Sequence, residues 1–170
     1  MPTSAALAAV DLGRPPRTPE EAVGWARAVL APGAAVVVGI GIPTGATTAS
    51  DLAVLDTDGR LRAHDLVDSA DGWALTALDY ATASRFLLAY NAANVREWLM
   101  LDAARAGFAL GELAAPEHWS CVMRARSAAI GRPDRLYPLG VARGAVAVAG
   151  LALRVIEDIA RGRYGPTGWP

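Results

Sequence analysis

Apolar residues follow two patterns near the start of the chain, one typical of helices and one typical of buried strands. Residues 18–31 carry apolar side chains at helical spacing, with Thr18 placed to cap the helix and Pro19 at its first position. Residues 34–42 are continuously apolar and rich in valine and isoleucine. That run predicts a strand that is buried on both faces.

Two further strands follow this run and predict an antiparallel meander. Residues 50–57 and 61–67 have strand-like patterns, and the dipeptide Asp58-Gly59 between them is typical of a tight hairpin. Three successive strands joined by short turns pair most simply as neighbours.

The second half of the chain is predominantly helical in its pattern. It predicts a short helix or ordered loop over residues 71–81, a strand over 85–90, and helices over 92–106, 119–130 and 138–161. Together these elements predict an α/β domain with a mixed sheet flanked by helices. We expect the domain to span residues 18–161, between a flexible N-terminal arm (1–17) and a C-terminal tail (162–170).

Composition and charge narrow the possible functions. The chain has 170 residues, of which 53% are hydrophobic and 19% charged, so it is long and apolar enough to fold as one domain. A net charge of -1 provides no general attraction for a nucleic-acid backbone. Cys121 is the only cysteine, which excludes an internal disulfide. No signal-peptide or membrane-span pattern is present, so we expect a cytoplasmic protein with no membrane partner.

Two polar features have ordinary structural interpretations. The densest basic stretch contains Arg124, Arg126, Arg132 and Arg135, and we interpret it as a solvated face. Cys121 is interpreted as a small buried hydrophobic residue.

Three segments carry a family resemblance through their order and spacing. Residues 36–45 (VVVGIGIPTG), followed by an apolar strand and an Asp-Gly hairpin, are similar to a strand that runs into D-x-E-T-T-G. Residues 90–99 (YNAANVREWL) resemble Y-N-A-x-F-D-x-x-x-L, and residues 136–143 (LYPLGVAR) resemble H-x-A-L-x-D-A-R. Residues 119–123 (WSCVM) resemble a W-x-C-x-M helix start. These are motifs of the 3′-5′ exonucleases of the DEDD superfamily, and the resemblance implies a ribonuclease-H-like fold.

This chain lacks the catalytic side chains that the family uses. Members of the family hold two divalent cations with four carboxylates and use a histidine as general base. In this chain the corresponding positions are all aliphatic: Ile40 and Ile42 for the D-x-E pair, Val95 and Val141 for the other two aspartates, and Leu136 for the histidine. We therefore expect no metal, no other cofactor and no nuclease activity, because hard cations need oxygen ligands.

The replacements suggest an apolar pocket at the former metal site. Ile40 and Ile42 are two residues apart on a strand, so both point to the same face. The resemblance would bring them together with the other three aliphatic positions. Polar residues that adjoin these positions complete the candidate ligand site: Thr44, Tyr90, Asn91, Asn94 and Tyr137. The expected ligand is a hydrophobic small molecule, and any catalysis would be non-hydrolytic, such as a cyclisation or rearrangement in biosynthesis.

Two alternatives stay open. In the first, the cleft is filled by its own side chains, and the protein acts as a scaffold through protein contacts, a homodimer included. A non-cleaving nucleic-acid binder is the other alternative, although the near-neutral charge argues against it.

Overall fold

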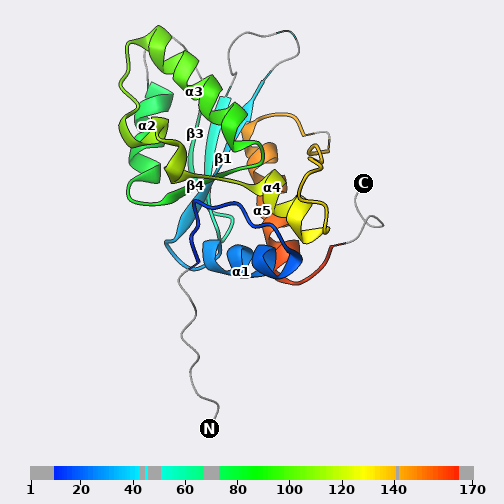
Figure 1. Cartoon of the computed structure of the whole chain (residues 1–170). Helices are drawn as coiled ribbons and strands as arrows, with labels where there is room; N and C mark the ends of the chain where they lie inside the picture. Colours follow the sequence, from blue (N-terminus) through cyan, green and yellow to red (C-terminus); the bar gives the residue numbers. More distant parts are fainter. Residues whose placement is uncertain (1–9, 43–44, 46–50, 67–72, 141, 165–170) are drawn as a thin grey trace.

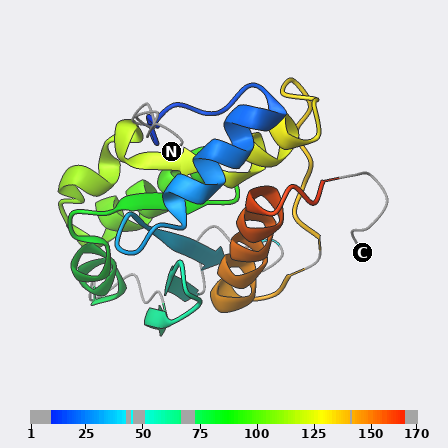
Figure 2. The same ribbon diagram turned by 90° about the horizontal axis from the view of Figure 1, so that it is seen from below.

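A five-stranded sheet lies between two layers of helices (Figures 1 and 2). The computed structural model describes residues 10–42, 45, 51–66, 73–140 and 142–164. The strands are β1 (Ala35–Gly41), β2 (Asp51–Asp56), β3 (Leu61–Leu66), β4 (Phe86–Ala89) and β5 (Trp119–Cys121). The helices are α1 (Pro19–Val29), α2 (Trp73–Thr82), α3 (Ala92–Ala106), α4 (Val122–Ala129) and α5 (Ala145–Ala160), with short 3₁₀ turns η1 (Gly111–Ala114) and η2 (Pro116–His118). The predicted α/β class with a mixed sheet is confirmed.

Alternation along the central strands divides the core into two clusters. Helices α1, α4 and α5 cover one face of the sheet, on which Val37 and Leu88 lie. Helices α2 and α3 cover the other face, on which Val36 and Val38 lie. Because β1 is buried along its whole length, its continuous apolar sequence follows from its central position.

The predicted antiparallel meander is present. Strand β2 pairs with β1 from Val36↔Asp56 to Gly41↔Asp51, and β3 pairs with β2 on the outer side. Gly59 has φ +85°, a conformation that favours glycine, and its amide donates to the Asp56 carbonyl at 2.9 Å. The Asp-Gly signal therefore identified the hairpin correctly.

Strand β5 corrects one prediction. Residues 119–130 were expected to form a single helix, but Trp119–Cys121 pairs in parallel with β4 and the helix starts at Val122. Trp119 packs into the α2–α3 side of the core, whereas the Ser120 hydroxyl accepts a 3.1 Å hydrogen bond from the Trp25 indole on the other side. These tertiary partners on both faces of the sheet favour a strand, and no local pattern reveals them.

Helix α5 corrects a second prediction. It was expected from residue 138 but begins at Ala145, preceded by Gly144 at φ +85°. The Asp51 carboxylate accepts a hydrogen bond from the Ala145 amide at 2.9 Å and so fixes the start of the helix. Close packing on β1 depends on Gly39, since a Cβ there would lie 2.8 Å from the Ala149 amide nitrogen.

Both predicted terminal segments are described in part. In the predicted arm, Leu12 packs against the core beside α1, and Pro16 is buried. At the other end, Tyr164 packs against the same cluster. Residues 1–9 and 165–170 lie outside the described residues. Among the helices that the structure describes, none combines the length and the apolarity that crossing a membrane requires.

Candidate functional site

Ile40 and Val95, two of the positions where the resemblance implies carboxylates, lie in one buried hydrophobic cluster. Each residue is 6% exposed, and the cluster fills the space between the sheet and helices α2 and α3. Ile40 comes near the end of β1, and Val95 lies in the first turn of α3. The strand end and the helix start are therefore joined by hydrocarbon, where an unpaired carboxylate would be strongly unfavourable.

Ile42 and Leu136 have a different environment. They are 40% and 50% exposed, respectively, so neither is part of the buried core. Ile42 follows the last residue of β1, beyond the ladder that ends at the pair Gly41↔Asp51. Thr44 and Val141 lie outside the described residues. The convergence of all five aliphatic side chains on one cleft stays a prediction.

Tyr90, proposed as a ligand group, has structural partners for its hydroxyl. The hydroxyl donates to the Tyr137 carbonyl at 2.6 Å and accepts from Arg126 Nη1 at 2.8 Å. Burial raises the pKa of the Tyr90 phenol, and the hydrogen bond from Arg126 opposes that rise. The residue anchors the loop after α4 and is the neutral donor of this contact.

Tyr137 is held in place by arginines. The guanidinium carbons of Arg126 and Arg135 lie 5.8 and 5.4 Å from the centroid of its ring, and Arg126 also donates to the Pro138 carbonyl at 3.3 Å. Arg126 is half-buried in these contacts, so interpreting the whole basic stretch as a solvated face was wrong for this residue. Tyr90, Arg126 and Tyr137 together fix the loop that carries Leu136.

Asn91 and Asn94 lie exposed at the start of α3. Asn91 is the N-cap residue of α3, but its side chain makes no capping hydrogen bond. Of the polar residues of the predicted site that the structure describes, these two are the exposed ones. They can donate to or accept from a ligand at this end of the sheet.

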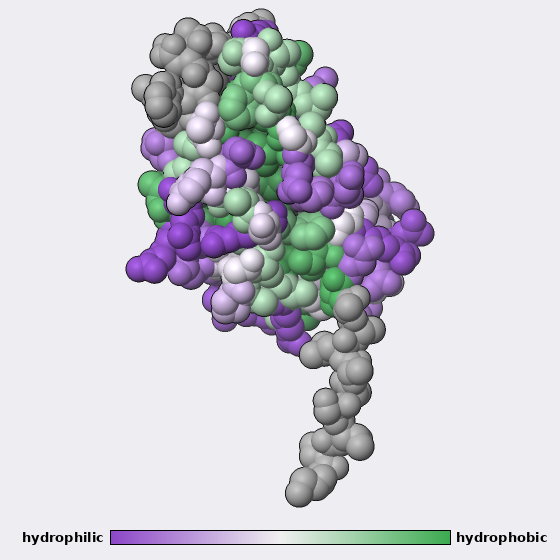
Figure 3. All heavy atoms as spheres, turned by 90° about the vertical axis from the view of Figure 1, so that its left-hand side faces the viewer, coloured by the Kyte–Doolittle hydropathy of each residue, from purple (hydrophilic) through white to green (hydrophobic). Residues whose placement is uncertain are grey.

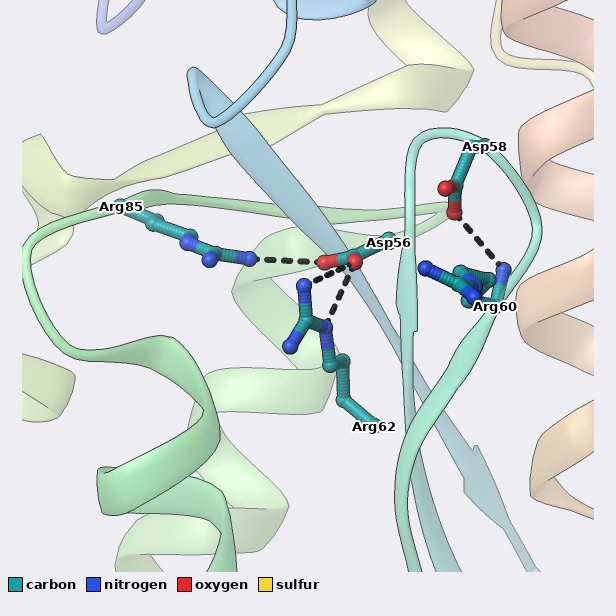
Figure 4. A network of polar contacts seen from close by, with 5 residues as sticks. All are labelled: Asp56, Asp58, Arg60, Arg62 and Arg85. Carbon is teal, nitrogen blue, oxygen red and sulfur yellow. Dashed lines mark hydrogen bonds and ion pairs between the residues drawn. The ribbon is translucent and has the colours of Figure 1, made fainter.

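Three described aspartates, Asp51, Asp56 and Asp102, are paired with basic side chains. Asp56 accepts from Arg62 Nε at 2.6 Å and from Arg85 Nη1 at 2.7 Å (Figure 4). The hydrogen bond from Arg62 lowers the pKa of Asp56, with Arg85 acting in the same direction and burial opposing both. Asp51 lies 3.2 Å from His64 Nε2 in addition to its bond with α5, and the buried Asp102 pairs with Arg105 at 3.3 Å.

These pairings provide no substitute metal centre in the described part of the chain. Within residues 10–42, 45, 51–66, 73–140 and 142–164, no three His, Cys, Asp or Glu side chains are grouped so that they could hold a metal ion.

A hollow lies on another side of the α3 start. It has a volume of about 180 Å³ and includes none of the predicted site residues that the structure describes. We call it the arginine-rimmed hollow; its lining residues are Gly13, Pro15, Ala92, Ala93, Arg96, Pro116, Trp119, Ser120, Cys121 and Arg124. Sequence reasoning did not single out Arg96 and assigned Arg124 to a solvated stretch. No local pattern would have joined them, because the hollow is assembled from segments more than 100 residues apart.

Comparison with known proteins gives no relative: no family model, no curated protein and no solved structure matches the chain. Functional argument therefore depends on the residues and their geometry alone.

Proposed function

We propose that this chain is an exonuclease-like protein with a ribonuclease-H-like scaffold that binds a hydrophobic small molecule and does not hydrolyse phosphodiesters. The placement of two motifs supports the scaffold. The Asp-Gly hairpin lies within the antiparallel meander, and Tyr90-Asn91 lies between β4 and α3. These two motifs support the proposal, whereas residues 138–140, expected in the last helix, precede α5, and Trp119–Cys121, expected at a helix start, forms β5.

The shared burial of Ile40 and Val95 carries the non-hydrolytic part of the proposal. Two side chains from elements far apart in sequence occupy, as hydrocarbon, positions where the family would bind cations. Hard divalent cations take oxygen ligands, which neither residue offers. Asp51, Asp56 and Asp102 have partners elsewhere. Two-metal hydrolysis therefore has no ligand set among these residues.

The exposed side chains among the predicted site residues support ligand binding. Ile42 and Leu136 keep exposed apolar area, and the amides of Asn91 and Asn94 are exposed at the start of α3. Apolar surface with a few polar groups is the usual composition of a small-molecule site. Any reaction there would depend on shape and exclusion of water, as in a cyclisation or rearrangement.

Binding can be measured with N-phenyl-1-naphthylamine, a neutral apolar probe that fluoresces on leaving water. We expect saturable binding to the full chain and at least fivefold weaker binding to Ile42→Asn, because the change places an amide in the apolar surface. Leu61→Asn is the matched control, since Leu61 is 53% exposed on β3, and it should bind like the wild type. Equal binding by both variants, or no saturable binding, contradicts the proposed ligand site.

The absence of nuclease activity has its own test. The full chain is incubated with manganese and end-labelled single-stranded DNA or RNA, and we expect the labelled strand to keep its length. Progressive loss of 3′-terminal nucleotides that stays proportional to the protein through further purification would overturn the non-nuclease part of the proposal.

A second candidate function is a scaffold that acts through protein contacts. Burial of Ile40 and Val95 favours a filled cleft, and Tyr80 on α2 and Met100 and Leu101 on α3 are 89%, 46% and 48% exposed. Figure 3 shows apolar residues between hydrophilic ones on the face that carries these helices. Self-association is the form of this function that can be tested with the chain alone. A sedimentation mass that rises with protein concentration in the wild type, but stays that of the monomer in a Met100→Glu, Leu101→Glu variant, favours this function.

A further inference from the structure

The arginine-rimmed hollow has walls that are already fixed by the fold. The Trp119 indole donates to the Leu113 carbonyl at 2.8 Å, and Ser120 accepts from Trp25. The Cys121 thiol lies 3.4 Å from the Tyr90 carbonyl oxygen, to which it donates. These groups therefore meet their hydrogen-bonding needs within the protein. They present mainly apolar surface to the hollow.

The N-terminal segment closes one side. Gly13 packs so tightly that a Cβ on it would lie 3.1 Å from the Glu117 carbonyl oxygen, and its amide donates to Asp11 Oδ1 at 3.0 Å. Pro15 and Pro116 add rigid hydrocarbon on the same lining. The hollow is thus built from preorganised segments, which lowers the cost of ordering it around a ligand.

Two arginines supply the charge. Arg96 donates from Nη1 to the Ala114 carbonyl at 3.1 Å, which orients its guanidinium at the lining. Arg124 reaches the same hollow from α4 and forms no hydrogen bond or ion pair with another described residue. Among the described residues of the lining there is no aspartate or glutamate. An apolar hollow with two cationic groups and no acid is complementary to an anion that has an apolar body.

We propose that the arginine-rimmed hollow binds a small organic carboxylate with an aromatic or other compact apolar body. The planar guanidinium of an arginine can accept a carboxylate through two parallel hydrogen bonds. The volume of about 180 Å³ lies below the range of about 300–1,000 Å³ that is usual for drug-sized ligands, which favours a body of one or two rings. This site goes beyond the proposed function, because it shares no described residue with the former metal site.

The probe is 1-naphthoate, with neutral 1-naphthylmethanol as its uncharged analogue, measured by calorimetry on the full chain. We expect 1-naphthoate to bind at least tenfold more tightly than the alcohol, because charge-assisted hydrogen bonds to arginine account for the difference. Inorganic phosphate, which lacks an apolar body, should compete poorly. Equal binding of the alcohol, or equal competition by phosphate, overturns the assignment.

Variants locate the site. Arg124→Gln should weaken 1-naphthoate binding about tenfold, while Arg132→Gln, an exposed arginine outside the hollow, leaves it unchanged. Ala93→Glu places a carboxylate in the hollow and should abolish binding, with Ala104→Glu as the exposed control on the same helix. Unaltered binding in Arg124→Gln and Ala93→Glu rejects the hollow as the site.

Cys121 gives a second readout that does not depend on any variant. It lines the hollow and is the only cysteine in the chain, so alkylation by iodoacetamide reports on this place alone. Saturating 1-naphthoate should slow the alkylation at least fivefold, whereas N-phenyl-1-naphthylamine at the former metal site should leave it unchanged. An unchanged rate with bound 1-naphthoate places the ligand elsewhere and overturns the proposal.

Discussion

Helix α3 has two contrasting sides at its start. On one side Val95 packs with Ile40 in a cluster that leaves each of them 6% exposed. On the other side Ala93 and Arg96 line an open hollow of about 180 Å³. The two sides belong to the same helical turn, so backbone geometry does not account for the difference.

Side-chain size and branching account for it. Branched aliphatic residues fill the space between the strand end and the helix, and dispersion contacts hold them there. At the hollow, small alanine and proline side chains lie near the short edge strand β5 and leave space. Arg96 and Arg124 line this space without filling it. At Ile40 and Val95 the catalytic centre that the resemblance implies is thus core, whereas the hollow, to which the resemblance assigns no function, is open.

The largest expected effect on stability comes from placing the same acidic residue on each side of α3. Val95→Asp places a carboxylate in the buried cluster and should destabilise the fold by about 3–5 kcal/mol, a large part of the total stability of a small domain. Ala93→Asp, two residues earlier and exposed, should change stability by no more than about 0.5 kcal/mol. Urea unfolding of both variants, followed by circular dichroism, measures the contrast.

A Val95→Asp variant that stays within about 1 kcal/mol of the wild type would break the comparison. It would show that water or a cation reaches this position, and that the former metal site is open. Repeating the unfolding with added magnesium distinguishes these cases, since only a bound cation stabilises the variant in proportion to the logarithm of its concentration.

The anchoring role of Tyr90 gives an intermediate effect. Tyr90→Phe removes the hydrogen bonds to the Tyr137 carbonyl and from Arg126, and should cost about 1–2 kcal/mol because those partners lose a buried hydroxyl. Tyr80→Phe is the control, since Tyr80 is 89% exposed and should be neutral. A neutral Tyr90→Phe variant would return this hydroxyl to the list of groups available to a ligand.

Local signals predicted much of the fold. Thr18 accepts the predicted capping bond from the Glu21 amide, and Asp58-Gly59 forms the predicted hairpin. Each depends on neighbours in sequence. The two errors, at Trp119 and at residue 138, arose where distant groups decide: the core partners of β5, and the Asp51 carboxylate that starts α5.

The candidate site shows the same limit more strongly. Motif spacing assigned Ile40 and Val95 to neighbouring positions, and the structure packs them in one cluster. Motif spacing did not reveal that Ile42 and Leu136 would be exposed, because exposure depends on which other parts of the protein cover a residue. The arginine-rimmed hollow joins residues 13 to 124 through tertiary contacts alone, so sequence patterns give no signal for it.

The smallest expected effect is at Asp56, which lies at the end of the sheet away from Ile40. Its buried carboxylate is paired there with two guanidinium groups, those of Arg62 and Arg85. Asp56→Asn should cost about 1 kcal/mol near pH 7, while Asp79→Asn on the exposed side of α2 should be neutral. The pKa of Asp56 is lowered in the folded state, so its contribution is complete above the ordinary value of 3.8 and disappears as the pH falls through the lowered pKa. Urea unfolding curves of wild type and Asp56→Asn should therefore converge at acidic pH. If the difference in unfolding free energy between the two proteins persists unchanged below that pKa, Asp56 stabilises the fold by packing and not by its charge.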